Sequence, residues 1–75
     1  MTSAEKIEKY LKRISKSTCP KDYNAGLHLF SEVWNDEIKF RADIGYVWTG
    51  TWSDSIQEAL DGLVQELIRV GEIEE

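Results

Sequence analysis

Cysteine, proline and histidine each occur only once in this chain of 75 residues. The lone Cys19 cannot form a disulfide within the chain, and Cys19 with His28 does not provide the ligand spacing of a metal site. The chain also lacks a signal-peptide pattern and any apolar run long enough to cross a membrane. These absences predict one cytoplasmic domain without a cofactor, a bound metal or a membrane partner.

The residues that enzymes use are present but are not combined into a site. No nucleophile accompanies His28, and Cys19 precedes a proline in a predicted loop. Gly50 alone does not make a phosphate-binding loop, because the segment around it has no lysine. The acidic residues are too dispersed for a calcium loop. We therefore expect a protein that is not an enzyme.

Charge is unevenly distributed along the chain. Residues 1–21 hold six Lys/Arg and two Glu, a net charge of +4, whereas residues 22–75 hold three Lys/Arg and twelve Asp/Glu, a net charge of −9. Such a division can steer a partner, or it can let a basic helix lie beside an acidic body. We favour the second interpretation, because helices commonly carry cations toward their C-terminal ends.

The segment from Leu27 to Ile44 predicts a β-hairpin of defined register, with strands 27–34 and 37–44. Asn and Asp tolerate the positive φ of a two-residue turn at positions 35 and 36, so Trp34 faces Glu37. One face is then apolar and the other is polar with aromatic rings, and a slip of one residue would mix them. The apolar pairs are Val33–Ile38, Leu29–Ala42 and Leu27–Ile44; the polar pairs are Glu32–Lys39, Phe30–Arg41 and His28–Asp43.

Two helices flank the hairpin. Thr2 and Glu5 have the spacing of a capping box, and the apolar spacing that follows predicts a helix over residues 3–16. Ser55 and Glu58 form a second capping box, which opens a helix over residues 55–70. Gly71 ends this helix, and residues 72–75 read as a fraying acidic tail. The apolar stripe of the second helix comprises Ile56, Ala59, Leu60, Leu63, Val64, Leu67 and Ile68.

The segment between the hairpin and the second helix is rich in residues that favour strands. It is either a third strand over residues 46–52, turned back at Ile44-Gly45, or a continuation of the second strand with a bulge at Gly45. We favour the third strand. It would place Trp48 opposite Arg41 and Val47 opposite Ala42, which keeps the two faces of the sheet distinct.

The element order and residues 50–59, Gly-Thr-Trp-Ser-Asp-Ser-Ile-Gln-Glu-Ala, resemble the double-stranded RNA-binding domain. Ser55 matches that family's helix cap and Ala59 its packing alanine. The positions of the phosphate-gripping lysines hold Ile56 and Gln57 instead. The strand-loop-helix entry also resembles antitoxins of the HicB type, whose glycine lies closer to the cap than Gly50 lies to Ser55. Both resemblances cover about a third of the chain and imply architecture only.

The sequence thus predicts an α+β domain of order α-β-β-β-α over residues 1–75, with both helices on one face of an antiparallel sheet. The helices would cover the face made by Leu27, Leu29, Val33, Ile38, Phe40 and Ala42. The other face would be open, and aromatic residues with arginine often carry interface energy. We expect this face to bind a protein partner through Phe30, Trp34, Arg41 and Trp48.

Other interpretations stay open. The rings on the open face would add only stability if they merely cover one another. A homodimer through this face or through the edge of the first strand would equally suit the pattern. Direct binding to nucleic acid is not expected from a body of net charge −9 and would fall on Lys6, Lys9, Arg13 and Lys16 of the first helix.

The alternative function is an inhibitor that mimics nucleic acid, as a phage-encoded anti-defence protein would. Surface carboxylates would then stand in for phosphates on a nucleic-acid-handling complex. The candidate carboxylates are Asp22, Asp36, Glu37, Asp54, Asp61, Glu66, Glu72, Glu74 and Glu75.

Overall fold

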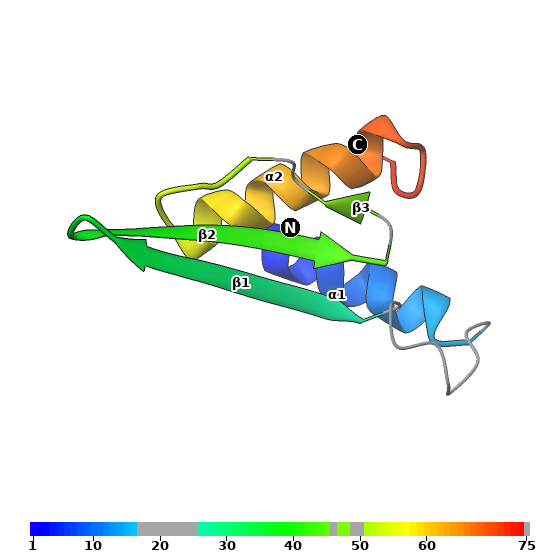
Figure 1. The fold of residues 1–75 in the computed structure, drawn as a ribbon. Helices are drawn as coiled ribbons and strands as arrows, with labels where there is room; N and C mark the ends of the chain where they lie inside the picture. Colours follow the sequence, from blue (N-terminus) through cyan, green and yellow to red (C-terminus); the bar gives the residue numbers. More distant parts are fainter. Residues whose placement is uncertain (17–25, 46, 49–50, 75) are drawn as a thin grey trace.

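The computed structural model of the chain describes residues 1–16, 26–45, 47–48 and 51–74. The strands form an antiparallel sheet in the order β1-β2-β3, and the two helices lie on one side of it (Figure 1). The predicted α+β fold and the order α-β-β-β-α are confirmed. The elements are α1 (Ser3–Ile14), β1 (Leu27–Trp34), β2 (Glu37–Ile44), β3 (Val47–Trp48) and α2 (Ile56–Arg69).

The hairpin has the predicted register at every pair, from Trp34 opposite Glu37 to Leu27 opposite Ile44. Asn35 and Asp36 have φ values of 50° and 60°. These are the left-handed conformations that a two-residue turn of type I′ requires at both central positions. The local turn chemistry and the alternation of the strands therefore determine the same pairing.

The third strand exists, but its predicted register is wrong by two residues. Trp48 lies opposite Asp43 and Val47 opposite Ile44. The turn starts one residue later than predicted because Gly45, with a φ of 57°, takes the left-handed position that Ile44 would resist. An offset of two keeps every side chain on its expected face. Of the predicted strand over 46–52, residues 46, 49 and 50 lie outside the described residues.

Capping fixes the ends of the helices. The Thr2 hydroxyl accepts a hydrogen bond from the Glu5 N–H and the Glu5 carboxylate accepts one from the Thr2 N–H, which completes the predicted capping box. The Ser55 hydroxyl caps α2 by accepting from the Glu58 N–H at 3.1 Å. Gly71, with φ of 83°, ends α2 in a Schellman motif. Each helix is slightly shorter than the predicted range, because α1 ends at residue 14 and α2 spans 56–69.

The core lies between the helices and the base of the hairpin. Here α2 packs on β2 and β3, and α1 packs on α2. The buried side chains are Ile7 and Tyr10 of α1, Ala42 and Ile44 of β2, and Ala59, Leu63, Val64 and Leu67 of α2. Leu27 and Phe40 are half-buried against this cluster.

The prediction that the helices cover the whole apolar face is wrong for Leu29, Val33 and Ile38, which are 50%, 74% and 51% exposed. Leu29 lies on the edge strand β1, opposite Ala42 of β2, and it is β2 on which α2 packs. Val33 and Ile38 lie at the turn end, where the cause is length: α1, with 12 residues, is about 18 Å long, whereas an eight-residue strand spans about 27 Å. The hairpin therefore projects beyond the helices (Figure 1).

Candidate functional site

The side of the sheet that faces away from the helices, here called the open face, carries its side chains in rows across the strands. Residues paired across strands point to the same side of a sheet, so the pairings define the rows. The bridge between Phe40 and Ser53 sets both on the helix side and their neighbours on the open face. From the turn to the base, the rows are Trp34 with Glu37; Glu32, Lys39 and Asp54; Phe30, Arg41 and Trp52; and His28, Asp43 and Trp48.

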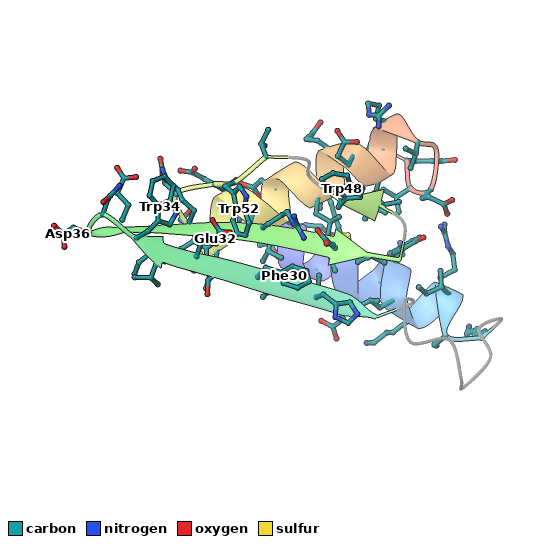
Figure 2. All side chains as sticks on the ribbon, in the orientation of Figure 1. Phe30, Glu32, Trp34, Asp36, Trp48 and Trp52 are labelled. Atoms are coloured by element: carbon teal, nitrogen blue, oxygen red, sulfur yellow. The ribbon has the colours of Figure 1, made fainter. Side chains whose placement is uncertain are left out.

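Arg41 stands at the centre of this face. Its Cζ atom lies 4.9 Å from the ring centroid of Phe30, 5.3 Å from that of Trp52 and 5.5 Å from that of Trp48. These distances fall within the range of cation–π attraction. Figure 2 shows that the three rings come from β1, β3 and the segment before α2. We call these residues, together with Asp43, the Arg41 cluster.

Asp43 neutralises the guanidinium inside the cluster. Its Oδ1 atom lies 3.3 Å from Nε of Arg41, and its Oδ2 atom accepts a hydrogen bond of 3.3 Å from Nη2. The Nε and Oδ1 atoms are buried but do not form a hydrogen bond, so the contact between them is purely electrostatic. The side chains of Arg41 and Asp43 are only 27% and 19% exposed. The cluster therefore has an enclosed ion pair beneath its rings.

Three of the four predicted binding residues, Phe30, Arg41 and Trp48, meet in this cluster. The fourth, Trp34, lies in the row next to the turn, opposite Glu37, and its ring is not among the three that surround Arg41. Sequence reasoning missed Trp52, which reaches Arg41 because Ser53 pairs with Phe40. The exposed rings are Phe30 at 43%, Trp34 at 54%, Trp48 at 53% and Trp52 at 37%.

The charges of the open face do not pair as predicted. Lys39 lies opposite Glu32 in the backbone register, but its ammonium group makes an ion pair with Asp54 on the other side. The hydrogen bond from Lys39 to Asp54 raises the pKa of the lysine. Among the described residues, Glu32 and Glu37 have no ion pair. The open face therefore combines exposed rings with two carboxylates that are free of cations.

His28 belongs to the edge of the cluster. Its ring lies nearly parallel to that of Phe30, with centroids 6.4 Å apart and an interplanar angle of 17°. Its partner across the strands is Asp43, whose carboxylate contacts Arg41. His28 therefore extends the row of rings, and the carboxylate opposite it is engaged by Arg41.

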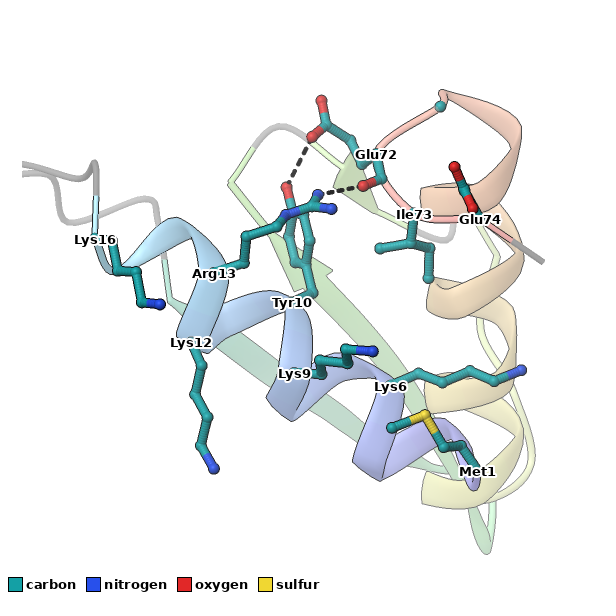
Figure 3. Close-up of a pocket in the computed structure, with 11 residues that line it drawn as sticks. Met1, Lys6, Lys9, Tyr10, Lys12, Arg13, Lys16, Glu72, Ile73 and Glu74 are labelled. Atoms are coloured by element: carbon teal, nitrogen blue, oxygen red, sulfur yellow. Dashed lines mark hydrogen bonds between the residues drawn. The ribbon is translucent and has the colours of Figure 1, made fainter.

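A second surface, the basic groove, lies along α1 (Figure 3). Lys6, Lys9, Arg13 and Lys16 recur at helical spacing and line it, together with Tyr10 and the residues after α2. The groove joins the basic helix to the acidic end of the chain. No ion pair among the described residues joins α1 to the acidic remainder, so the internal use of the charge asymmetry stays a prediction.

The acidic end of the chain is tied into this groove. The Tyr10 hydroxyl donates to the Glu72 carboxylate at 3.2 Å, and Arg13 donates to the Glu72 carbonyl oxygen while lying 5.1 Å from the Tyr10 ring centroid. Burial and Glu72 raise the pKa of Tyr10. Ile73 packs against the core. The prediction of a fraying tail is wrong for these residues, because both a charge and an apolar side chain hold them.

In the part of the chain that the structure describes, no group of three or more His, Cys, Asp or Glu residues could hold a metal ion. In the same ranges, no helix combines the length and apolar character needed to cross a bilayer. The chain matches no family model, no curated protein and no solved structure.

Proposed function

We propose that the protein is a non-enzymatic interaction module that binds a protein partner through the open face. The observation that carries this proposal is the group of four exposed rings, three of them arranged around an enclosed Arg41–Asp43 pair. Tryptophan and arginine are enriched among the residues that dominate binding energy. The contact residues in this proposal are Phe30, Trp34, Trp48 and Trp52, with Arg41 holding three of the rings in place.

The alternative, that the rings only stabilise the sheet, accounts less well for their exposure. Trp48 and Trp34 each leave about half of their surface in water, at 53% and 54%. Stacking on Arg41 restricts the motion of Phe30, Trp48 and Trp52 before any partner arrives, so binding would require less additional ordering. A restricted, exposed aromatic group is better suited to recognition than to filling a core.

The charges around the rings indicate the chemistry of the partner. Glu32 and Glu37 stand beside Trp34 and lack cations among the described residues, whereas Lys39 and Arg41 are neutralised by Asp54 and Asp43. The open face therefore offers apolar rings edged by negative charge. We propose a partner segment that is apolar with flanking lysine or arginine, because it would complement both features.

Capture from the native cell tests this proposal when three forms of the tagged protein are compared. These are the wild type, the double variant Trp34→Ala/Trp48→Ala, and Val70→Ala, which removes an exposed apolar side chain at the end of α2. The expected partner is retained by the wild type and by Val70→Ala and is lost by the double variant. Equal retention of every protein by all three forms, each with an unchanged circular dichroism spectrum, would refute binding through the open face.

Mimicry of nucleic acid is the second candidate, and one observation favours it. Asp36 and Glu37 are exposed at the projecting turn of the hairpin, without an ion pair among the described residues. Other carboxylates of the predicted display are engaged within the molecule: Asp54 pairs with Lys39, Asp61 accepts from Ser3 and Gln57, Glu66 pairs with Arg69, and Glu72 accepts from Tyr10. Asp22 and Glu75 lie outside the described residues.

Salt dependence separates the two candidates once a partner is in hand. Binding through rings edged by Glu32 and Glu37 should weaken only moderately as salt rises and should be lost in Trp34→Ala/Trp48→Ala, whereas mimicry should weaken steeply as salt rises and should suffer most from Asp36→Asn. A regulator that uses the basic groove on nucleic acid is the least favoured candidate, because Arg13 and Glu72 already engage one another there.

We place the proposed module in the cytoplasm, where a chain with a single cysteine needs no disulfide.

A further inference from the structure

Strand β1 forms an edge of the sheet that the rest of the described chain leaves uncovered. It is the first strand in the order β1-β2-β3, and seven of its eight residues are exposed. Leu29 and Val33 are 50% and 74% exposed on the helix side, and Phe30 and Trp34 are 43% and 54% exposed on the open face. An edge strand with apolar side chains on both sides is a ready template for pairing with another strand.

The hydrogen bonds that β2 makes on its other side show which backbone N–H and C=O groups of β1 point outward. Phe40 exchanges two hydrogen bonds of 2.8 Å with Ser53, so its N–H and C=O point away from β1. Ser31 lies opposite Phe40 and therefore belongs to a pair that is not hydrogen-bonded, with its own N–H and C=O directed outward. By alternation, the backbone groups of Leu27, Leu29 and Val33 also point outward.

Most of the devices that normally protect an edge strand are missing from β1. Natural edge strands are kept short, carry charged side chains, above all lysine, carry proline, or contain a bulge. This strand is eight residues long, has neither lysine nor proline, and pairs with β2 one residue to one throughout; its one carboxylate is that of Glu32. The edge is therefore open to pairing with another strand.

We propose that β1 pairs antiparallel with β1 of a second copy of this chain, which joins two three-stranded sheets into one of six strands. A second copy fits because the strand is complementary to itself when the two-fold axis passes through Ser31. Leu29 then lies opposite Val33 of the second copy, and this contact occurs twice. Glu32 lies opposite Phe30, so no two carboxylates face each other directly. This inference does not depend on the proposed function of the open face.

The first test is the mass of the wild type in solution, measured by sedimentation velocity over a dilution series from millimolar to micromolar protein. The expected mass is twice 8.7 kDa at the upper end of the series. Ser31→Pro removes an outward N–H without touching a bond to β2, and Val33→Lys places a charge on the edge. Both variants should be monomers, whereas Val70→Lys, an equivalent change at an exposed valine of α2, should stay dimeric.

Amide hydrogen exchange of the wild type locates the interface without any substitution. The N–H groups of Leu29, Ser31 and Val33 should exchange slowly at high concentration and quickly on dilution. The inference is overturned if the wild type is monomeric over the whole series, or if these three amides exchange quickly in the dimer. Dimers that persist in both Ser31→Pro and Val33→Lys would also overturn it, because the interface would then lie elsewhere.

Discussion

Replacing Arg41 with methionine tests how much the Arg41 cluster contributes to the free energy of unfolding. The change keeps an apolar stem of similar length but removes the guanidinium, which lies within 5.5 Å of three ring centroids. It also leaves the carboxylate of Asp43, 19% exposed, without its cation. Two separate losses are therefore expected from one substitution.

The magnitude follows from these contacts. Three cation–π contacts at about 0.5–1 kcal/mol each sum to about 1.5–3 kcal/mol. An enclosed carboxylate that has lost its partner adds about 1–3 kcal/mol. Because the contacts share one guanidinium they will not add fully, and we expect a total loss of about 3–5 kcal/mol. A domain of 75 residues is expected to have only about 4–11 kcal/mol of stability.

The assay is urea unfolding followed by far-ultraviolet circular dichroism, which reports mainly on the helices and depends less on the tryptophan environment than fluorescence does. All variants are compared at one protein concentration, since a dimer would make stability depend on concentration. The control is Lys39→Met, the nearest cation on the same face of β2. Its ion pair with Asp54, whose side chain is 73% exposed, should contribute only about 0–1 kcal/mol.

A double variant separates the two losses. Arg41→Met/Asp43→Leu removes the unpaired carboxylate as well and should regain about 1–3 kcal/mol relative to Arg41→Met alone. The reasoning is refuted if Arg41→Met costs no more than Lys39→Met, or if the effects of the two changes in the double variant are simply additive.

Three further predictions concern the core, the basic groove and nucleic acid. Leu63→Ala should lower the free energy of unfolding by about 2–5 kcal/mol, because Leu63 is fully buried; an unchanged urea midpoint would contradict that placement. The raised pKa of Tyr10, caused first by burial and then by Glu72, should stabilise the fold fully below pH 10.0 and lose this effect as the pH rises through the folded value. Tyr10→Phe should therefore flatten the alkaline limb of a stability-pH profile, and a limb of unchanged slope would count against the Tyr10–Glu72 contact. Duplex DNA or RNA should show no mobility shift at physiological salt, and a salt-sensitive shift abolished by Lys9→Ala would favour the basic groove as a binding site.

The sequence-based predictions were correct where the interacting residues are close together along the chain and wrong where they are far apart. The hairpin register was predictable because Asn35, Asp36 and the alternating strands determine it within eighteen consecutive residues. The helix ends were predictable because Thr2 and Ser55 bond to amides three residues away. In these cases local chemistry and the final structure require the same arrangement.

The errors concern contacts made at longer range. The register of the third strand was predicted wrongly by two residues because both registers place every side chain on the same face of the sheet. Only the positive φ that the turn requires at Gly45 distinguishes them. The exposure of Val33 and Ile38 depends on how far two short helices reach along the hairpin, and that of Leu29 on which strand the helices cover; no local pattern records either. Trp52 joins Arg41 only through the bridge of Ser53 to Phe40.

The two proposed interfaces share Phe30 and Trp34 of β1, but they can be separated experimentally. Dimerisation needs the outward backbone groups of β1, whereas the Arg41 cluster extends across β2 to Trp48 on β3. Val33→Lys should therefore produce a monomer with an intact cluster, because Val33 points to the helix side and is 74% exposed. In the dimer, the two open faces would lie side by side on one continuous sheet, with Phe30 and Trp34 of both copies along the seam. A partner with two apolar segments would then bind more tightly to the dimer than to the monomer through effective concentration alone, without any new contact.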